Sequence, residues 1–136
     1  MKVIVDTDVW SEALRKKKGK KSDQVRELVE LIQEGRVEMI GPIRMEVLSG
    51  IRESNVFDSF AERLSAFPDR QISSEVYVLA ARFYNLCRSK GIQGSNTDFL
   101  ICACAVKWNV PILSKDKDYQ RYLKYVPIDI LKPRDG

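Results

Sequence analysis

Short apolar runs alternate along this chain with longer segments whose apolar residues recur at helical spacing. The runs at 2–5, 37–40 and 110–113 predict strands, 128–131 predicts a last strand, and 70–73 predicts a weaker one. Because these runs are mostly apolar on both faces, helices must cover both sides of the sheet. The pattern therefore predicts an α/β fold, a three-layer α/β/α domain with a mostly parallel central sheet of about five strands.

Helices are expected over 9–14, 22–35, 42–51, 56–67, 74–90, 99–108 and 119–123. Ser22 is placed to cap the second of these, and the glycines at 35 and 91 are placed to end two of them. The tail at 132–136 is expected to fray. No internal repeat or composition break divides the sequence, so residues 1–136 are predicted to form a single domain.

The composition excludes several kinds of chemistry. The chain has no histidine, which excludes a histidine-based triad, a histidine general base and a histidine-ligated zinc site. The cysteines at 87, 102 and 104 lie in helix-like apolar stretches and are expected to be reduced core thiols. The formal net charge is +4, and a basic surface favours polyanionic partners, nucleic acid above all.

The sequence also predicts a cytoplasmic protein without membrane association. No apolar run approaches the roughly 20 residues that a membrane-spanning helix needs. The N-terminal segment reaches Asp6 too soon for a signal peptide.

Four acidic residues stand at the ends or borders of apolar segments, where carboxylates are rare unless paired or bound to metal. Asp6 ends the first strand, Asp116 follows the run at 110–113, Asp98 opens an apolar helix, and Glu46 borders the apolar face of another. Ligands of open parallel sheets bind beyond the carboxyl ends of the strands. If the strands at 2–5 and 110–113 are neighbours, Asp6 and Asp116 meet there.

Clustered carboxylates repel one another, and a divalent cation resolves that repulsion. Ligands that are all oxygen suit Mg²⁺ or Mn²⁺, and Mg²⁺ keeps waters that can serve as nucleophiles. With a basic surface, this points to phosphodiester hydrolysis.

Each acid also has a purely structural explanation. Asp6 and Asp116 fit turns, and Glu46 fits a boundary residue that reaches solvent. Asp98 fits a capping box with Ser95, and Asp118 fits a helix start or an exposed position. The joint pattern carries the prediction.

A dense basic run occupies 15–21, with Arg15, Lys16, Lys17, Lys18, Lys20 and Lys21 as its cations. Such a run is either a solvated loop or an arm that contacts the phosphates of RNA. Lys115 and Lys117 lie close to Asp116 in sequence and are candidates to assist RNA binding there.

Four segments together resemble the PIN-domain nucleases, in particular the compact VapC-type toxins of toxin–antitoxin pairs. They are Val5-Asp6-Thr7-Asp8-Val9, Glu46-Val47-Leu48-Ser49-Gly50, Asp98-Phe99-Leu100-Ile101-Cys102-Ala103 and Ile112-Leu113-Ser114-Lys115-Asp116-Lys117-Asp118-Tyr119. The resemblance implies a metal-dependent endoribonuclease that forms a homodimer and is blocked by a cognate antitoxin.

The resemblance also implies site residues. The family's catalytic and metal-binding acids fall on Asp6, Glu46, Asp98 and Asp116, with Asp6 and Asp98 as the most direct ligands. Asp8 departs from the family, which often has Asn or Ser there, and a fifth acid would alter metal binding. The hydroxyl of Ser114 would support Asp116 from beside the metal site.

Two other functions remain open at the level of sequence. The string Asp6-Thr7-Asp8-Val9 also resembles the start of haloacid-dehalogenase-type phosphatases, with Asp6 as nucleophile and Asp8 as acid and base. A non-catalytic RNA- or protein-binding module with the same fold is the second.

Overall fold

The sheet is short, parallel and built around the N-terminal strand. The computed structural model describes residues 1–15 and 19–135, in which β1 (Val3–Val5) lies between β2 (Val37–Glu38) and β3 (Ile112–Leu113). Ile4 of β1 pairs with Glu38 on one side and with Ile112 on the other. The predicted α/β class with a parallel sheet is therefore confirmed, and the first strand is a neighbour of the run at 110–113, the condition on which the meeting of acids at this sheet edge depended.

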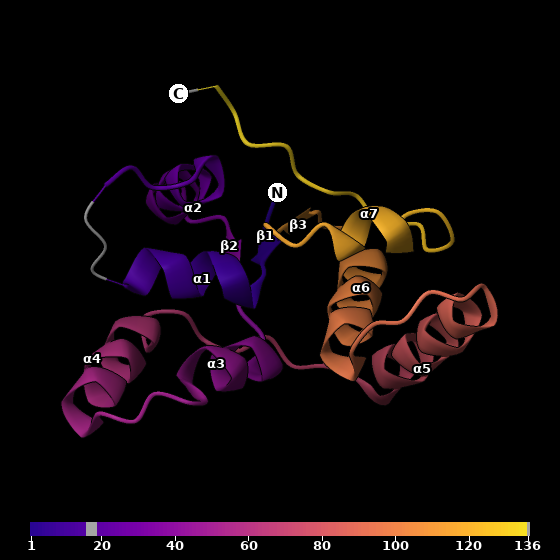
Figure 1. Cartoon of the computed structure of the whole chain (residues 1–136), viewed down its shortest axis with the longest axis horizontal. Coiled ribbons are helices and arrows are strands. Elements are labelled where there is room, and N and C mark those ends of the chain that lie inside the picture. The colour runs from indigo at the N-terminus through magenta and orange to yellow at the C-terminus, as the bar shows by residue number, and fades with distance from the viewer. Residues whose placement is uncertain (16–18, 136) are drawn as a thin grey trace.

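The helices lie on both sides of this sheet (Figure 1). They are α1 (Thr7–Leu14), α2 (Asp23–Gln33), α3 (Gly41–Leu48), α4 (Ser54–Leu64), α5 (Ser74–Ser89), α6 (Asn96–Trp108) and α7 (Asp118–Tyr122). In Figure 1, α1 and α2 lie on one side of the strands, and α5 and α6 lie on the other. Within the described ranges, no helix combines the length and apolarity that crossing a membrane requires.

Two predicted strands are wrong. Residues 70–73 and 128–131 form no strand, and single bridges, Met39 with Asp69 and Ile112 with Ile130, are all that pairs near them. In the first segment only Ile72 is partly buried, so it has no apolar face to add to the sheet. Within the described part of the chain, the second segment is bonded to β3 through Ile112 alone. The Ile112 N–H donates to the Asp129 carbonyl, and the Leu131 N–H donates to the Ile112 carbonyl.

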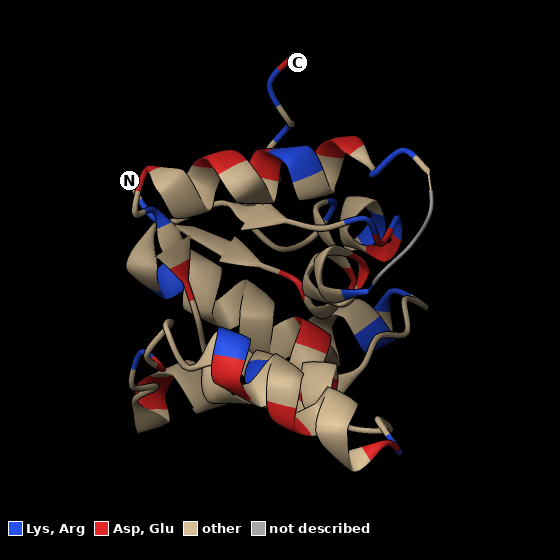
Figure 2. Cartoon of the chain, turned by 90° about the vertical axis from the view of Figure 1, so that its left-hand side faces the viewer, with Lys and Arg blue, Asp and Glu red and all other residues tan. Residues whose placement is uncertain are grey.

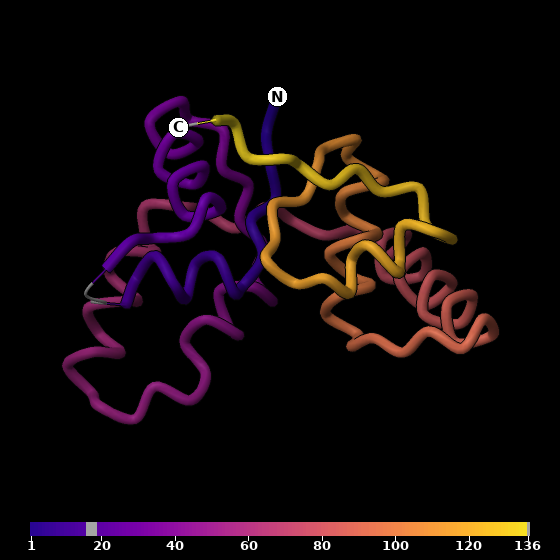
Figure 3. Tube along the Cα trace, turned by 45° about the horizontal axis from the view of Figure 1, so that its top comes forward, coloured from indigo at the N-terminus to yellow at the C-terminus, as the bar shows by residue number. Residues whose placement is uncertain are grey.

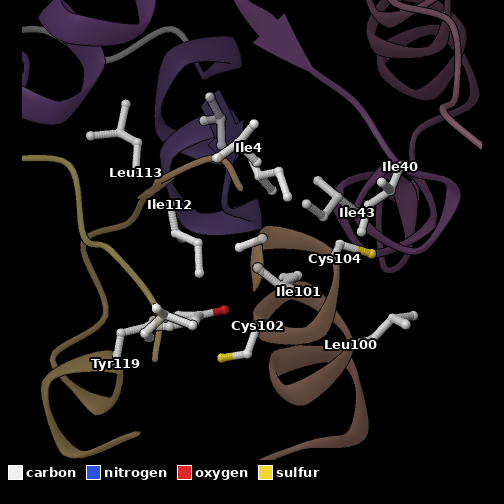
Figure 4. Packing of buried hydrophobic residues seen from close by; sticks show 14 of the residues in the cluster. Ile4, Ile40, Ile43, Leu100, Ile101, Cys102, Cys104, Ile112, Leu113 and Tyr119 are labelled. Atoms are coloured by element: carbon white, nitrogen blue, oxygen red, sulfur yellow. The ribbon is translucent and has the colours of Figure 1, made fainter. Parts of the chain in front are cut away.

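The core is centred on the contact of β1 and β3 with α6 (Figure 4). Val3, Ile4 and Val5 have no exposed surface, and every residue from Phe99 to Ala105 is buried. A helix buried on all sides needs apolar or small residues around its whole circumference. The prediction of buried free thiols at 87, 102 and 104 is confirmed, and burial raises the pKa of Cys104 to about 12, so that it stays protonated.

The C-terminal segment is not frayed at Arg134, contrary to expectation. It crosses from α7 to α2 (Figure 3), where the Arg134 guanidinium lies 2.8 Å from carboxylate oxygens of both Glu27 and Glu34. Glu27 is only 4% exposed and also accepts the Arg134 backbone N–H. This buried acid on α2 needed a partner, which the distant tail supplies. The charged residues of α2 are mostly acidic, with Arg26 as its basic residue (Figure 2).

Candidate metal centre

Asp6 lies where β1 ends and α1 begins. Its backbone N–H donates to Leu113 of β3, and its side chain caps α1 by accepting the Thr7 N–H at 2.8 Å. Its other carboxylate oxygen accepts the Ser114 hydroxyl at 2.7 Å. The pKa of Asp6 is raised to about 7, chiefly by burial and then by the charge of the neighbouring Asp8, while the hydrogen bonds from Ser114 and Thr7 limit the rise.

Asp98 serves both as a helix-start residue and as an acid of the cluster. Its backbone N–H donates to the capping hydroxyl of Ser95 at 3.0 Å, as the capping box predicts. Its carboxylate accepts the Tyr122 hydroxyl at 2.7 Å. Burial raises the pKa of Asp98, and the charges of Asp116 and Glu46 raise it as well.

Asp116, on the loop after β3, and Asp118, at the start of α7, lie beside Asp98 of α6. One carboxylate oxygen from each of the three lies within 4.8 Å of the others. The Asp118 N–H donates to the Asp116 carboxylate at 2.9 Å, which folds the two acids toward the same side. Asp118, which sequence patterns assign to a helix start or the surface, is therefore both the first residue of α7 and a member of the cluster.

Glu46 borders this cluster from α3. Its side chain is exposed, and one of its oxygens accepts the Thr7 hydroxyl at 2.6 Å. Thr7 follows Asp6 directly, so this bond holds α3 against the start of α1 beside the buried acid. Sequence reasoning missed Thr7, although its position between two acids was a usable signal.

Ser114 and Asp8 complete the edge of the site. The Ser114 hydroxyl donates to the carboxylate of Asp6 and accepts the backbone N–H of Asp116 at 2.9 Å. Ser114 was expected to support Asp116, and its hydroxyl does so through the backbone of that residue. The carboxylate that the hydroxyl contacts is the one of Asp6. Asp8 accepts the Lys115 N–H at 3.1 Å, and burial raises the pKa of Asp8.

The predicted RNA-contacting cations differ in their surroundings. The Lys115 ammonium pairs with Glu12 at 2.7 Å, and that of Lys21 donates to the backbone carbonyls of Glu12 and Arg15. The hydrogen bond from Lys115 is the main reason that the pKa of Glu12 falls to about 2. Exposed positions are held by Arg15, Lys20 and Lys117, whereas Lys16, Lys17 and Lys18 lie outside the described residues.

The donor set of the cluster fits a hard divalent cation. Carboxylate oxygens from two separate segments converge within the distance that one ion can bridge. Two further acids are close enough to interact with Asp98: the charge of Glu46 raises the pKa of Asp98, and the charge of Asp98 raises the pKa of Asp6. Oxygen-rich sites of this kind bind Mg²⁺, Mn²⁺ or Ca²⁺ in preference to zinc.

One family of known proteins matches most of the chain. The PIN domain family model matches residues 3–124. The chain belongs to the PIN domain family. Curated relatives of this PIN domain include the VapC ribonuclease Mb1587 of Mycobacterium bovis and ribonuclease VapC11 of Mycobacterium tuberculosis. Each is 28% identical over 119 residues, which cover 86% of this chain and 88% of the relative. The match sets aside the haloacid-dehalogenase alternative.

Solved structures share the fold of this PIN domain. FitAcB from Neisseria gonorrhoeae superposes with a TM-score of 0.75 at 16% identity, covering 96% of this chain and 97% of that one. VapBC2 from Rickettsia felis, bound to a DNA fragment from its promoter, has a TM-score of 0.75 at 18% identity, with 99% and 100% covered. At these identities the likeness shows the fold alone.

Proposed function

We propose that this chain is a single PIN domain, residues 1–136, that hydrolyses RNA phosphodiester bonds as a metal-dependent endoribonuclease. The observation that carries the proposal is the meeting of carboxylate oxygens from Asp98, Asp116 and Asp118 within 4.8 Å, beside the buried Asp6. The VapC relatives are named ribonucleases, which supports RNA as the substrate.

The acids divide into ligands and supports. Asp6, Glu46, Asp98 and Asp116 are the proposed catalytic and metal-binding residues, and the geometry adds Asp118. When bound, Mg²⁺ or Mn²⁺ would acidify water and stabilise the charge that develops during in-line displacement at phosphorus. Ser114 orients Asp6, and Thr7 orients Glu46. A raised pKa at Asp6 means that the proton on this carboxylate competes with the cation near neutral pH.

RNA would approach across the exposed cations. The formal net charge of +4 and the exposed Arg15, Lys20 and Lys117 support contacts to the RNA backbone. Lys115 is engaged by Glu12, so its proposed role is to hold the loop after β3 in place.

We further propose that the protein acts as the toxin of a toxin–antitoxin pair. It would form a homodimer and be blocked by a cognate antitoxin. The VapC relatives and the fold shared with VapBC2 and FitAcB support this role.

The direct test is cleavage of structured RNA by the purified chain with Mg²⁺, Mn²⁺ or a chelator. Asp98→Asn and Asp116→Asn should abolish cleavage, while Asp58→Asn, which changes an exposed acid on α4, should leave it intact. Calorimetry with Mn²⁺ should give binding to the wild type and weakened binding to both site variants. Absence of both cleavage and ion binding would favour a non-catalytic RNA- or protein-binding module instead.

A further inference from the structure

Tyr122, the last residue of α7, contacts the acid cluster through Asp98. Its hydroxyl donates to an Asp98 oxygen at 2.7 Å, while Ser95 holds the backbone N–H of the same aspartate. Asp98 is thereby fixed at two points: the capping serine fixes its main chain, and the phenol fixes its carboxylate. Tyr122 is not one of the proposed metal ligands.

The ring of Tyr122 cannot swing away from this position. It is fully buried, with its centroid 4.8 Å from that of Phe99 and 5.3 Å from that of Tyr119. Phe99 directly follows Asp98, so the ring packs on the same helical turn that carries the carboxylate. A hydroxyl held by such packing loses little conformational freedom when it donates a hydrogen bond.

Gly94 provides the space that this phenol occupies. A Cβ atom at position 94 would lie 2.8 Å from Cζ of Tyr122, closer still to its hydroxyl oxygen, and 2.9 Å from Cε2 of Phe99. These contacts are shorter than real Cβ atoms tolerate, and both partners are buried rings. Glycine is needed here for room.

We propose that Tyr122 is a positioning residue of this nuclease, which holds the Asp98 carboxylate beside Asp116 and Asp118 for metal binding, with Gly94 leaving the space for its phenol. The inference rests on the proposed function and extends it to residues outside the ligand set. Without the hydrogen bond, repulsion from Asp116 and Asp118 would turn Asp98 away from the cluster before an ion binds. Groups that orient metal ligands typically contribute roughly 10- to 100-fold to metal affinity or activity.

Tyr122→Phe tests this with the smallest possible change, because it removes one oxygen and keeps the ring. Isothermal calorimetry with Mn²⁺ on the purified full chain should give a dissociation constant roughly 10-fold higher than that of the wild type. Cleavage should need correspondingly more Mn²⁺ and should recover when Mn²⁺ is in excess. Tyr125→Phe is the matched control, because it removes a phenol oxygen from an exposed tyrosine three residues further along.

A double-mutant cycle with Gly94→Ala provides a second measurement. Gly94→Ala alone should weaken Mn²⁺ binding by displacing the phenol. Combined with Tyr122→Phe, it should weaken binding by much less than the product of the two single effects, because both changes act through one hydrogen bond. Multiplicative effects would show that Gly94 acts independently of Tyr122 and would overturn its part in the proposal.

The outcomes separate this inference from the proposed function. If the wild type binds Mn²⁺ and cleaves RNA while Tyr122→Phe matches it in both, the positioning role is overturned and the nuclease proposal stands. If the wild type neither binds Mn²⁺ nor cleaves RNA, both fail. A loss of melting temperature in Tyr122→Phe with an unchanged Mn²⁺ dissociation constant would mark Tyr122 as a packing residue and also overturn the inference.

Discussion

At the scale of single residues, Asp6 unites the structural and the chemical demands on the site. It caps α1, it is nearly fully buried, and it carries a pKa raised to about 7 by burial and by Asp8. A carboxylate used only as a cap gains nothing from such surroundings, since a serine would cap as well. Burial and the charge of Asp8 disfavour the ionised form of Asp6, and a bound cation would stabilise that form.

Asp6→Asn should reduce RNA cleavage by at least about 100-fold. Groups that only orient a metal ligand contribute up to about 100-fold, and loss of a proposed ligand should cost no less. In metal-free buffer at pH 8 the same variant should be more stable than the wild type, because it removes a buried charge. Urea denaturation and a fluorescent RNA assay measure the two effects, with Asp58→Asn as control. A variant that is inactive and also less stable than the wild type at pH 8 would contradict the proposal that the ionised Asp6 carboxylate destabilises the metal-free protein.

The buried hydroxyl of Tyr119 lowers stability for a different reason, which is a hydrogen bond missing within the described part of the chain. Its side chain is 1% exposed, its hydroxyl has no hydrogen-bond partner among the described residues, and Figure 4 shows that hydroxyl directed toward Cys102. Tyr119→Phe should therefore stabilise the protein by about 1 kcal/mol in urea denaturation. Tyr125→Phe, at an exposed position, should change stability by less than about 0.5 kcal/mol. Destabilisation by Tyr119→Phe would reveal a partner for that hydroxyl.

At the scale of elements, the start of α6 matters because it carries Asp98. Ser95 accepts the Asp98 N–H there, whereas Ser73 at the equivalent position of α5 makes no capping side-chain bond. Ser95→Ala should cost about 1 kcal/mol of unfolding free energy. Ser73→Ala is the matched control and should cost clearly less. Equal losses in thermal or urea unfolding would show that the cap bond contributes nothing.

Helices were more predictable from the sequence than strands. The apolar spacing and the capping serine located α2 closely, because both signals are local. By contrast, 128–131 has the apolar residues of a strand, yet it pairs with β3 at one residue, and pairing depends on distant partners that no local pattern encodes. Similarly, α6 begins at Asn96 because its cap, Ser95, lies before the apolar residues that marked the helix.

The site was predictable where it follows from strand ends. The sequence placed Asp6 and Asp116 at one sheet edge on the condition that their strands are neighbours; β1 and β3 are parallel neighbours, and the side chain that reaches Asp6 from the later strand's end is that of Ser114. Asp118 and Tyr122 were missed because their placement depends on the direction in which α7 leaves the sheet. Asp98 fills both of the roles that the sequence left open: its backbone N–H donates to the capping Ser95, and its carboxylate lies in the cluster with Asp116 and Asp118.

At the scale of the whole molecule, stability should depend on pH in opposite ways on the two sides of about pH 4 to 5. The folded-state pKa of Asp6 lies above its ordinary value of 3.8, so the folded chain holds the proton more tightly, and stability falls as pH rises from about 4 to about 7. The pKa values of Glu12 and Glu34 are lowered to about 2, mainly by hydrogen bonds from Lys115 and Arg134, so their contribution is lost as pH falls below about 4.5.

Melting curves of the metal-free protein between pH 3 and 9 measure this dependence. The melting temperature should peak near pH 4 to 5 and decline toward pH 8. Saturating Mn²⁺ should raise it most at pH 8, where the acids are ionised and ligand binding stabilises the folded state. A melting temperature that rises from pH 5 to 8 without metal would be incompatible with the raised pKa of Asp6.

The tail is a second feature of the whole chain, because Arg134 joins the last residues to α2. Arg134→Ala leaves the buried Glu27 without its cation and should lower the melting temperature at pH 7. It should also expose the segment after Leu131 to proteolysis. Arg82→Ala, which removes an exposed arginine from α5, is the control and should change neither. Unchanged melting and proteolysis would show that the tail contact adds no stability.

The bond between Ser114 and Asp6 joins residues 108 positions apart, and the bond between Tyr122 and Asp98 closes the same site from still later in the chain. Long-range pairings of this kind form late, because the intervening chain must first be available. During synthesis, the first strand and the early helices emerge well before β3 and α7 exist. A ribosome that has not yet made the residues through Tyr122 therefore holds an incomplete acid cluster, and cleavage of nearby RNA has to wait until that segment has been made.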